Sequence, residues 1–160
     1  ASDHNPLVTA VRRTEPTDIT NRPAGKIVYD NRIEIIGWNM PAVVSRGSSF
    51  KVTLFYKVLQ PIPGAYKVFF HVDGSGLRFN GDHPPINDRC ATSYWKVGDY
   101  IADTFTVEAG GATFPSGLYD VWVGFFTGSN PNWRNMPVSN APADSRDNAD
   151  RVRLLKLKLD

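Results

Sequence analysis

Five side chains of types that bind metals lie between positions 71 and 83: His71, Asp73, Asn80, Asp82 and His83. His71 and Asp73 are two residues apart in an expected strand, so they point to the same face. Two imidazoles with carboxylates suit zinc, whereas Asp and Asn oxygens with loop carbonyls suit calcium. The spacing matches neither an EF-hand loop nor an H-E-x-x-H motif. We expect no cofactor beyond, at most, a structural calcium here; the alternative is that these side chains only cap turns and bond strand ends.

Aromatic side chains in polar segments form a second candidate site. Trp133 stands in the polar run 129–135 beside Arg134, and Tyr94 and Trp95 stand in another long loop. Sugar rings stack their C–H faces on such aromatics, while polar neighbours bond the hydroxyls. We therefore expect Trp133, Arg134, Tyr94 and Trp95 to bind a ligand, with sugar polymers as the favoured class. The structural alternative is that a loop tryptophan closes one end of the core, which is the favoured fate of Trp95.

Groups for catalysis are scattered. No G-x-S-x-G motif is present, and the thiol of Cys90 has only Arg89 and His83 near it in the sequence. A metal-dependent hydrolase would need His71, Asp73, Asp82 and His83 to converge. We expect that the protein is not an enzyme. Four scattered acids are expected to have turn or surface roles; they are Asp99, Asp103, Glu108 and Asp120.

The elements that must position these residues are strands. In segment 50–59, apolar residues alternate with polar ones, which is the period of a strand with one buried face. Gly37 predicts a bulge, and Trp38 and Trp122 are expected in the core. The other predicted strands cover 26–29, 32–38, 66–72, 100–107, 118–126 and 152–159. Short strands separated by Gly and Pro turns predict an all-β, antiparallel two-sheet β-sandwich, immunoglobulin-like or jelly-roll-like.

The domain organisation is simple. Residues 1–25 contain three prolines and no sustained period, so they are expected to form an extended linker or edge segment. Residues 26–160 are expected to form a single sandwich domain. The segments 77–96 and 127–149 are predicted to be long loops, and long loops in compact domains are often functional.

Composition limits the partners. The chain has 18 basic and 16 acidic residues, a net charge of +2, and both signs are mixed along it, so a nucleic-acid-binding face is not expected. No apolar run is long enough to span a membrane. One cysteine excludes an intrachain disulfide. The sequence begins at Ala1, so we expect that an upstream signal or anchor was removed and that the protein is periplasmic or extracellular.

The order of several motifs resembles a known kind of module. They are G-x-x-F-x-V-x-L-x-Y at 47–56, V-F-F-H-V-D at 68–73, R-F-N-G-D-H-P-P at 78–85, T-S-Y-W-K-V-G-D-Y at 92–100, P-S-G-L-Y-D-V-W-V-G-F-F at 115–126 and R-V-R-L at 151–154. This order is similar to accessory β-sandwich modules of bacterial envelope proteins, as found on some membrane glycosyltransferases and tetratricopeptide-containing proteins. The resemblance implies an envelope setting and a shape similar to carbohydrate-binding modules, and it assigns no residue a role.

Together these observations predict a non-catalytic binding module of the bacterial cell envelope that binds carbohydrate through aromatic rim loops. The alternative is a structural subunit or docking domain of a larger envelope assembly, held by strand addition at an exposed sheet edge. The expected partner is thus a glycan or an envelope protein.

Overall fold

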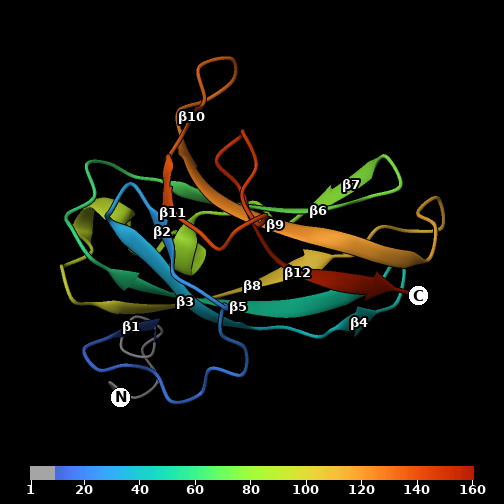
Figure 1. Ribbon diagram of the computed structural model, residues 1–160, viewed down its shortest axis with the longest axis horizontal. Helices are drawn as coiled ribbons and strands as arrows, with labels where there is room; N and C mark the ends of the chain where they lie inside the picture. Colours follow the sequence, from blue (N-terminus) through green and yellow to red (C-terminus); the bar gives the residue numbers. More distant parts are fainter. Residues whose placement is uncertain (1–9) are drawn as a thin grey trace.

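The computed structural model describes residues 10–160 and consists of two β-sheets packed against each other (Figure 1). This arrangement confirms the predicted two-sheet β-sandwich. Sheet A has the strand order β1 (Val11–Arg12), β8 (Tyr100–Glu108), β5 (Ser49–Val58), β3 (Ile33–Asn39), β2 (Ile27–Tyr29) and β11 (Val138–Asn140). Sheet B has the order β4 (Val43–Val44), β12 (Val152–Leu159), β9 (Gly117–Thr127), β6 (Lys67–Gly74) and β7 (Leu77–Asn80), and β10 (Arg134–Asn135) also pairs with β9.

The core lies between the sheets and takes alternate residues from the long strands. On β5, Phe50, Val52, Leu54, Tyr56 and Val58 are all buried, which confirms the period of two read from the sequence. On the two central strands of sheet B, β6 and β9, the buried residues are Val68, Phe70, Val72, Tyr119, Val121, Val123 and Phe125. The residues between them therefore face outward, on the side of sheet B away from the core.

The predicted bulge is present in β3, where the pairing with β5 shifts register between Ile35 and Gly37. A Cβ on Gly37 would lie 2.3 Å from Ile19 Cγ2 and 2.6 Å from the Asn21 carbonyl oxygen. Glycine is therefore needed for close approach of the N-terminal segment. Asn21 and Trp38 exchange backbone hydrogen bonds, which fasten that segment to β3.

Several short elements lie in segments that we predicted to be loops. The segment 77–96 contains β7 and two short 3-10 helices, η2 (Pro85–Asp88) and η3 (Thr92–Tyr94). The segment 127–149 contains β10 and β11. The pairing of β4 with β12 is parallel, whereas all other named strand pairs are antiparallel. Sheet B is therefore mixed at this edge.

The N-terminal part of the described chain lies along sheet A. Strand β1 pairs with the first two residues of β8, and Arg13 forms an ion pair with Asp99. Within residues 10–160, no helix combines the length and apolar character needed to cross a membrane.

Candidate functional site

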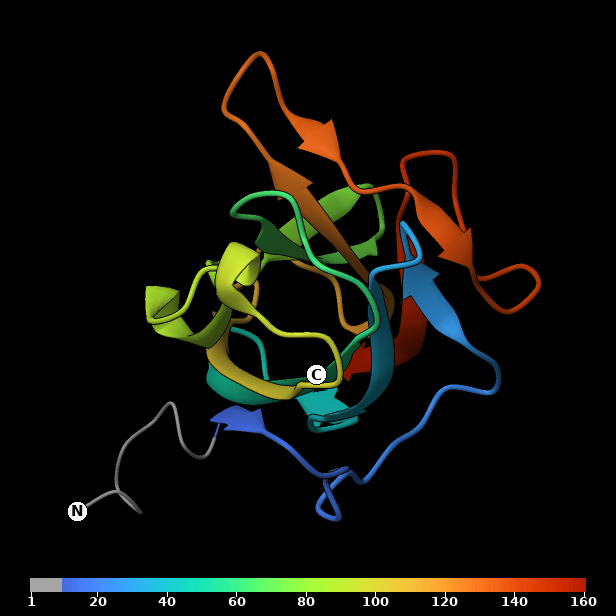
Figure 2. The same ribbon diagram turned by 90° about the vertical axis from the view of Figure 1, so that its left-hand side faces the viewer.

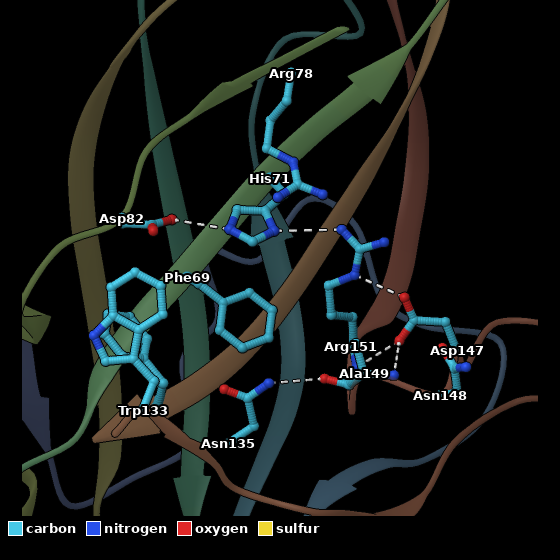
Figure 3. A pocket seen from close by; sticks show the side chains of 11 residues that line it. Phe69, His71, Arg78, Asp82, Trp133, Asn135, Asp147, Asn148, Ala149 and Arg151 are labelled. Carbon is cyan, nitrogen blue, oxygen red and sulfur yellow. Dashed lines mark hydrogen bonds and ion pairs between the residues drawn. The ribbon is translucent and has the colours of Figure 1, made fainter. Parts of the chain in front are cut away.

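A pocket of about 360 Å³ opens on the outward face of sheet B (Figure 3). Strands β6 and β9 provide its floor, and the ribbon of β9 and β10 provides one wall. Figure 2 shows this ribbon projecting beyond the body of the sandwich. The lining side chains are Phe69, His71, Arg78, Asp82, Phe126, Trp133, Asn135, Asp147, Asn148, Ala149 and Arg151.

One side of the pocket is aromatic. The tip of the Phe69 ring lies against Gly124 on the neighbouring strand, where a Cβ on Gly124 would be only 2.0 Å from Phe69 Cζ. The Phe126 ring lies 6.2 Å from Phe69 and 6.3 Å from Trp133, centroid to centroid. Trp133 is 62% exposed, so most of its ring surface is open to a ligand. Phe69 is only 5% exposed, so its ring forms the floor of the hollow, and Phe126 and Trp133 provide the more accessible ring surface.

The opposite side of the pocket is polar and is centred on His71. Arg151 Nη1 lies 3.3 Å from His71 Nδ1. A guanidinium can only donate, so Nδ1 accepts and the ring proton of a neutral His71 is on Nε2. Nε2 faces the Asp82 carboxylate at 3.6 Å, too long for a hydrogen bond (Figure 3). Asn135 donates its amide N–H to the Ala149 carbonyl, which orients its amide oxygen away from Ala149.

The charges of the pocket are paired. Asp73 accepts hydrogen bonds from Arg78 and Arg151, and Asp147 accepts two from Arg151 and one from the Ala149 N–H. Burial alone would raise the pKa of Asp73 and of Asp147, but these hydrogen bonds outweigh it and hold both pKa values below the ordinary value. The site therefore presents donors and acceptors with little net charge.

Trp122 lies next to the pocket on the outward face of β9, not in the core as we expected. Its ring supports Arg151, whose Cζ is 4.7 Å from the ring centroid, and Arg153 at 5.9 Å. The expectation was wrong because the inward positions of β9 are the odd-numbered ones, from Tyr119 to Phe125. Trp38, by contrast, is buried as predicted.

The structure divides the predicted metal-binding residues between two faces of sheet B. His71, Asp73 and Asn80 lie on the outward face, where His71 is directly opposite Asn80. His83 is opposite Val68, an inward-facing residue, so its ring turns towards the core. Within residues 10–160, no three His, Cys, Asp or Glu side chains gather as a metal site would require. The calcium hypothesis stays a prediction, with Asp73 bonded to two arginines and Asp82 to the Phe70 N–H.

Of the predicted ligand-binding aromatics, only Trp133 lines the pocket. Arg134 precedes Asn135 on β10, and consecutive strand residues point to opposite faces, so Arg134 faces away from the pocket that Asn135 lines. Tyr94 is 77% exposed but lies outside the pocket lining. Trp95 is 4% exposed and stacks on Tyr56, so it packs in the core.

Sequence reasoning missed most of the polar wall, which consists of Asn135, Asp147, Asn148 and Arg151. The only available signal was their place in or beside the Asn- and Asp-rich segment 127–149. Alternation alone predicts that Phe69 and Phe126 face outward, because Phe69 follows the core residue Val68 and Phe126 follows the core residue Phe125.

No protein-family model matches this chain, and a search of curated proteins found no matching sequence. The geometry of the pocket is therefore the basis for assigning a function. Flat apolar rings on one side, with amides, an imidazole and paired charges on the other, can stack a polar ring and bond its hydroxyl groups at the same time.

Proposed function

We propose that the protein is a non-catalytic binding module that holds a neutral carbohydrate in the pocket on the outward face of sheet B. One observation carries this proposal: Phe69, Phe126 and Trp133 surround a hollow whose other wall consists of hydrogen-bonding side chains. The C–H face of a sugar ring fits the aromatic wall, and its hydroxyl groups fit His71 and Asn135.

The paired charges favour a neutral sugar over an anionic ligand. The lining contains two guanidinium groups and two carboxylates. Arg151 already bonds Asp147 and Asp73, and Arg78 bonds Asp73 through two nitrogens. A phosphate or sulfate would have to compete with these carboxylates, whereas a hydroxyl group can donate to one partner and accept from another.

The cellular setting follows from the resemblance noted above. Modules of this kind accompany bacterial envelope proteins, so we place the proposed activity in the periplasm or outside the cell. In that setting a carbohydrate-binding module would bring its parent assembly to envelope glycans.

The test is isothermal titration calorimetry of the purified protein with neutral oligosaccharides of gluco-, xylo- and N-acetylglucosamine type, and with heparin as an anionic comparison. Binding to at least one neutral series is expected. Trp133→Ala should lower the affinity about fivefold, since loss of one stacked ring costs roughly 1 kcal/mol.

Tyr94→Ala is the matched control, because Tyr94 is also a largely exposed aromatic but lies outside the pocket lining. It should leave the affinity unchanged. Equal losses in both variants would contradict the pocket as the site, and binding to heparin alone would contradict the neutral ligand.

A second candidate is docking onto a protein assembly, and one observation favours it. Tyr94, the last residue of η3, and Val97, three residues further on, are both more than half exposed. Such side chains suit a protein contact. This candidate predicts that Tyr94→Ala, and not Trp133→Ala, abolishes capture of an envelope partner.

A further inference from the structure

His71 lies where the aromatic and the polar sides of the pocket meet, and it contacts both (Figure 3). The centroid of its ring is 5.0 Å from that of the Phe69 ring, and the two planes are tilted by 30°. On its other side, Nδ1 lies 3.3 Å from Arg151 Nη1. The His71 side chain is 18% exposed, so protons from the solvent can reach it. A change in the charge of this ring therefore acts on both sides of the pocket.

The contact between His71 and Arg151 requires a neutral imidazole ring. A guanidinium has donors and no acceptor, so Nδ1 must offer its lone pair. A proton on Nδ1 would place two cationic donors against each other at 3.3 Å. Arg151 is held by Nε, which bonds Asp147 at 2.7 Å, and by Nη1, which also bonds Asp73 at 3.0 Å. Protonation therefore has to displace the ring, or pull the guanidinium away from these carboxylates.

The surrounding charges decide which way the protonated ring moves. Asp82 faces Nε2 at 3.6 Å, and a small rotation of the ring would close this gap to a hydrogen-bonded ion pair. Strand β9 places Trp122 opposite His71 and so provides no charge there. The charged groups around the ring are Asp73 on β6, Arg78 on β7, Asp82 after β7, Asp147 and Arg151 before β12, and Arg153 on β12 across the Trp122 ring. Repulsion from Arg151 and attraction to Asp82 act in the same direction.

Movement of the ring towards Asp82 removes groups that a sugar would use. The new ion pair occupies the imidazole Nε2 proton and the Asp82 carboxylate, which otherwise face the pocket. The polar side also depends on Arg151, because Asp147 bonds both Arg151 and the Ala149 N–H. Asn135 in turn donates to the Ala149 carbonyl. The hydrogen-bonding groups offered to a ligand therefore change with the charge of one histidine.

We infer that protonation of His71 releases the carbohydrate, so that the pocket binds neutral sugars at neutral pH and releases them in acid. This inference rests on the proposed carbohydrate-binding function and adds its regulation. Histidine is the side chain type whose charge commonly changes between about pH 5 and pH 8. Binding and protonation are linked reciprocally, so a bound sugar also opposes protonation of the ring.

The experiment is calorimetry of the full chain with whichever neutral oligosaccharide binds, at pH values from about 7.5 to about 5.5. The wild-type affinity should fall at least about threefold across this range. Near pH 6.5, heats measured in two buffers of different ionisation enthalpy should differ, because binding releases protons. In His71→Gln, the affinity should not vary with pH, whatever its value.

His83→Gln is the matched control, because His83 is the other histidine within residues 10–160 and does not line the pocket. It should keep the full pH dependence of the affinity. A wild-type affinity that is constant with pH, or one that falls equally in His71→Gln, would overturn the regulation and leave the sugar site intact.

Nuclear magnetic resonance of the ligand-free protein tests the same displacement without a sugar. The Arg151 Nε–H signal should shift between about pH 7.5 and about pH 5.5 in wild type and in His83→Gln, and it should not shift in His71→Gln. A signal that is unchanged in wild type would overturn the inference. If no neutral sugar binds at any pH, the carbohydrate function fails, and this signal alone decides whether the charge of His71 rearranges the pocket.

Discussion

His83 Nε2 lies 2.7 Å from Asp103 Oδ2, and this contact links the chain after β7 to the inner face of β8. Asp103 is fully buried and also accepts hydrogen bonds from the Tyr56 hydroxyl at 2.7 Å and the Ile86 N–H at 3.0 Å. Ile86 has a φ of 56°, which is costly for a β-branched residue. One carboxylate therefore holds a strained segment against the open edge of sheet A.

Asp103→Asn should lower the free energy of unfolding by about 2–4 kcal/mol, measured by urea denaturation. An amide has one acceptor oxygen where the carboxylate has two, so at least one of three buried donors loses its partner. The two ring nitrogens of His83 face the Asp103 carboxylate and the Gly81 carbonyl. The substitution therefore also replaces the charged partner of this ring with a neutral one.

Asp144→Asn is the control for this substitution, because Asp144 is exposed and asparagine tolerates its φ of 64°. It should change stability by less than about 0.5 kcal/mol. A similar small effect for Asp103→Asn would show that the buried carboxylate does not hold the segment.

The long strands could be predicted from the sequence because a period of two is clear over eight or more residues. In β5 every second residue from Phe50 to Val58 is buried, and alternation alone identifies them. Strands such as β4 and β10 have two residues each, so they contain no period to detect. Their pairing depends on where the longer strands bring the chain.

The site could be predicted only in part, and the reason is register. Trp133 stood out because a large aromatic in a polar segment needs an explanation. His71 and His83 looked like partners by spacing, but the pairing of His83 with Val68 turns one ring inward while the other faces outward. A shift of one residue would reverse this, and spacing carries no information about it.

Gly124→Ala should lower stability by about 1–3 kcal/mol and displace the Phe69 ring from the floor of the pocket. The new Cβ would lie 2.0 Å from that ring, well inside van der Waals contact. The measurement is a urea titration, together with the affinity for whichever neutral oligosaccharide binds.

A double-mutant cycle with Phe69→Ala tests the cause of this effect. With the ring removed, Gly124→Ala should cost much less than in the wild-type chain, since the two positions are in contact. Additive costs would mean that the alanine acts through the backbone of β9 and not through Phe69.

Acidification should weaken the fold through Asp73. Its pKa is held below the ordinary value because hydrogen bonds from Arg78 and Arg151 outweigh the effect of burial. A carboxyl group with a depressed folded-state pKa stabilises the protein above its unfolded-state pKa, near 4, and this contribution is lost as the pH falls through the folded-state value. The difference in unfolding free energy between wild type and Asp73→Asn should thus be constant above about pH 5 and shrink below pH 4. Urea titrations at a series of pH values measure it, and a difference that does not vary with pH would contradict the arginine pairing.

Cys90 should react slowly with thiol reagents. Burial raises the pKa of the Cys90 thiol, and the negative charge of Asp99 raises it further, so less thiolate is present at neutral pH than in a free cysteine. The rate of reaction with a chromogenic disulfide, followed across pH, should therefore reach half its maximum at a higher pH than for glutathione, and unfolding in urea should remove the difference. A midpoint below that of glutathione would instead identify an activated thiolate, and with it a nucleophile that the non-catalytic proposal does not allow.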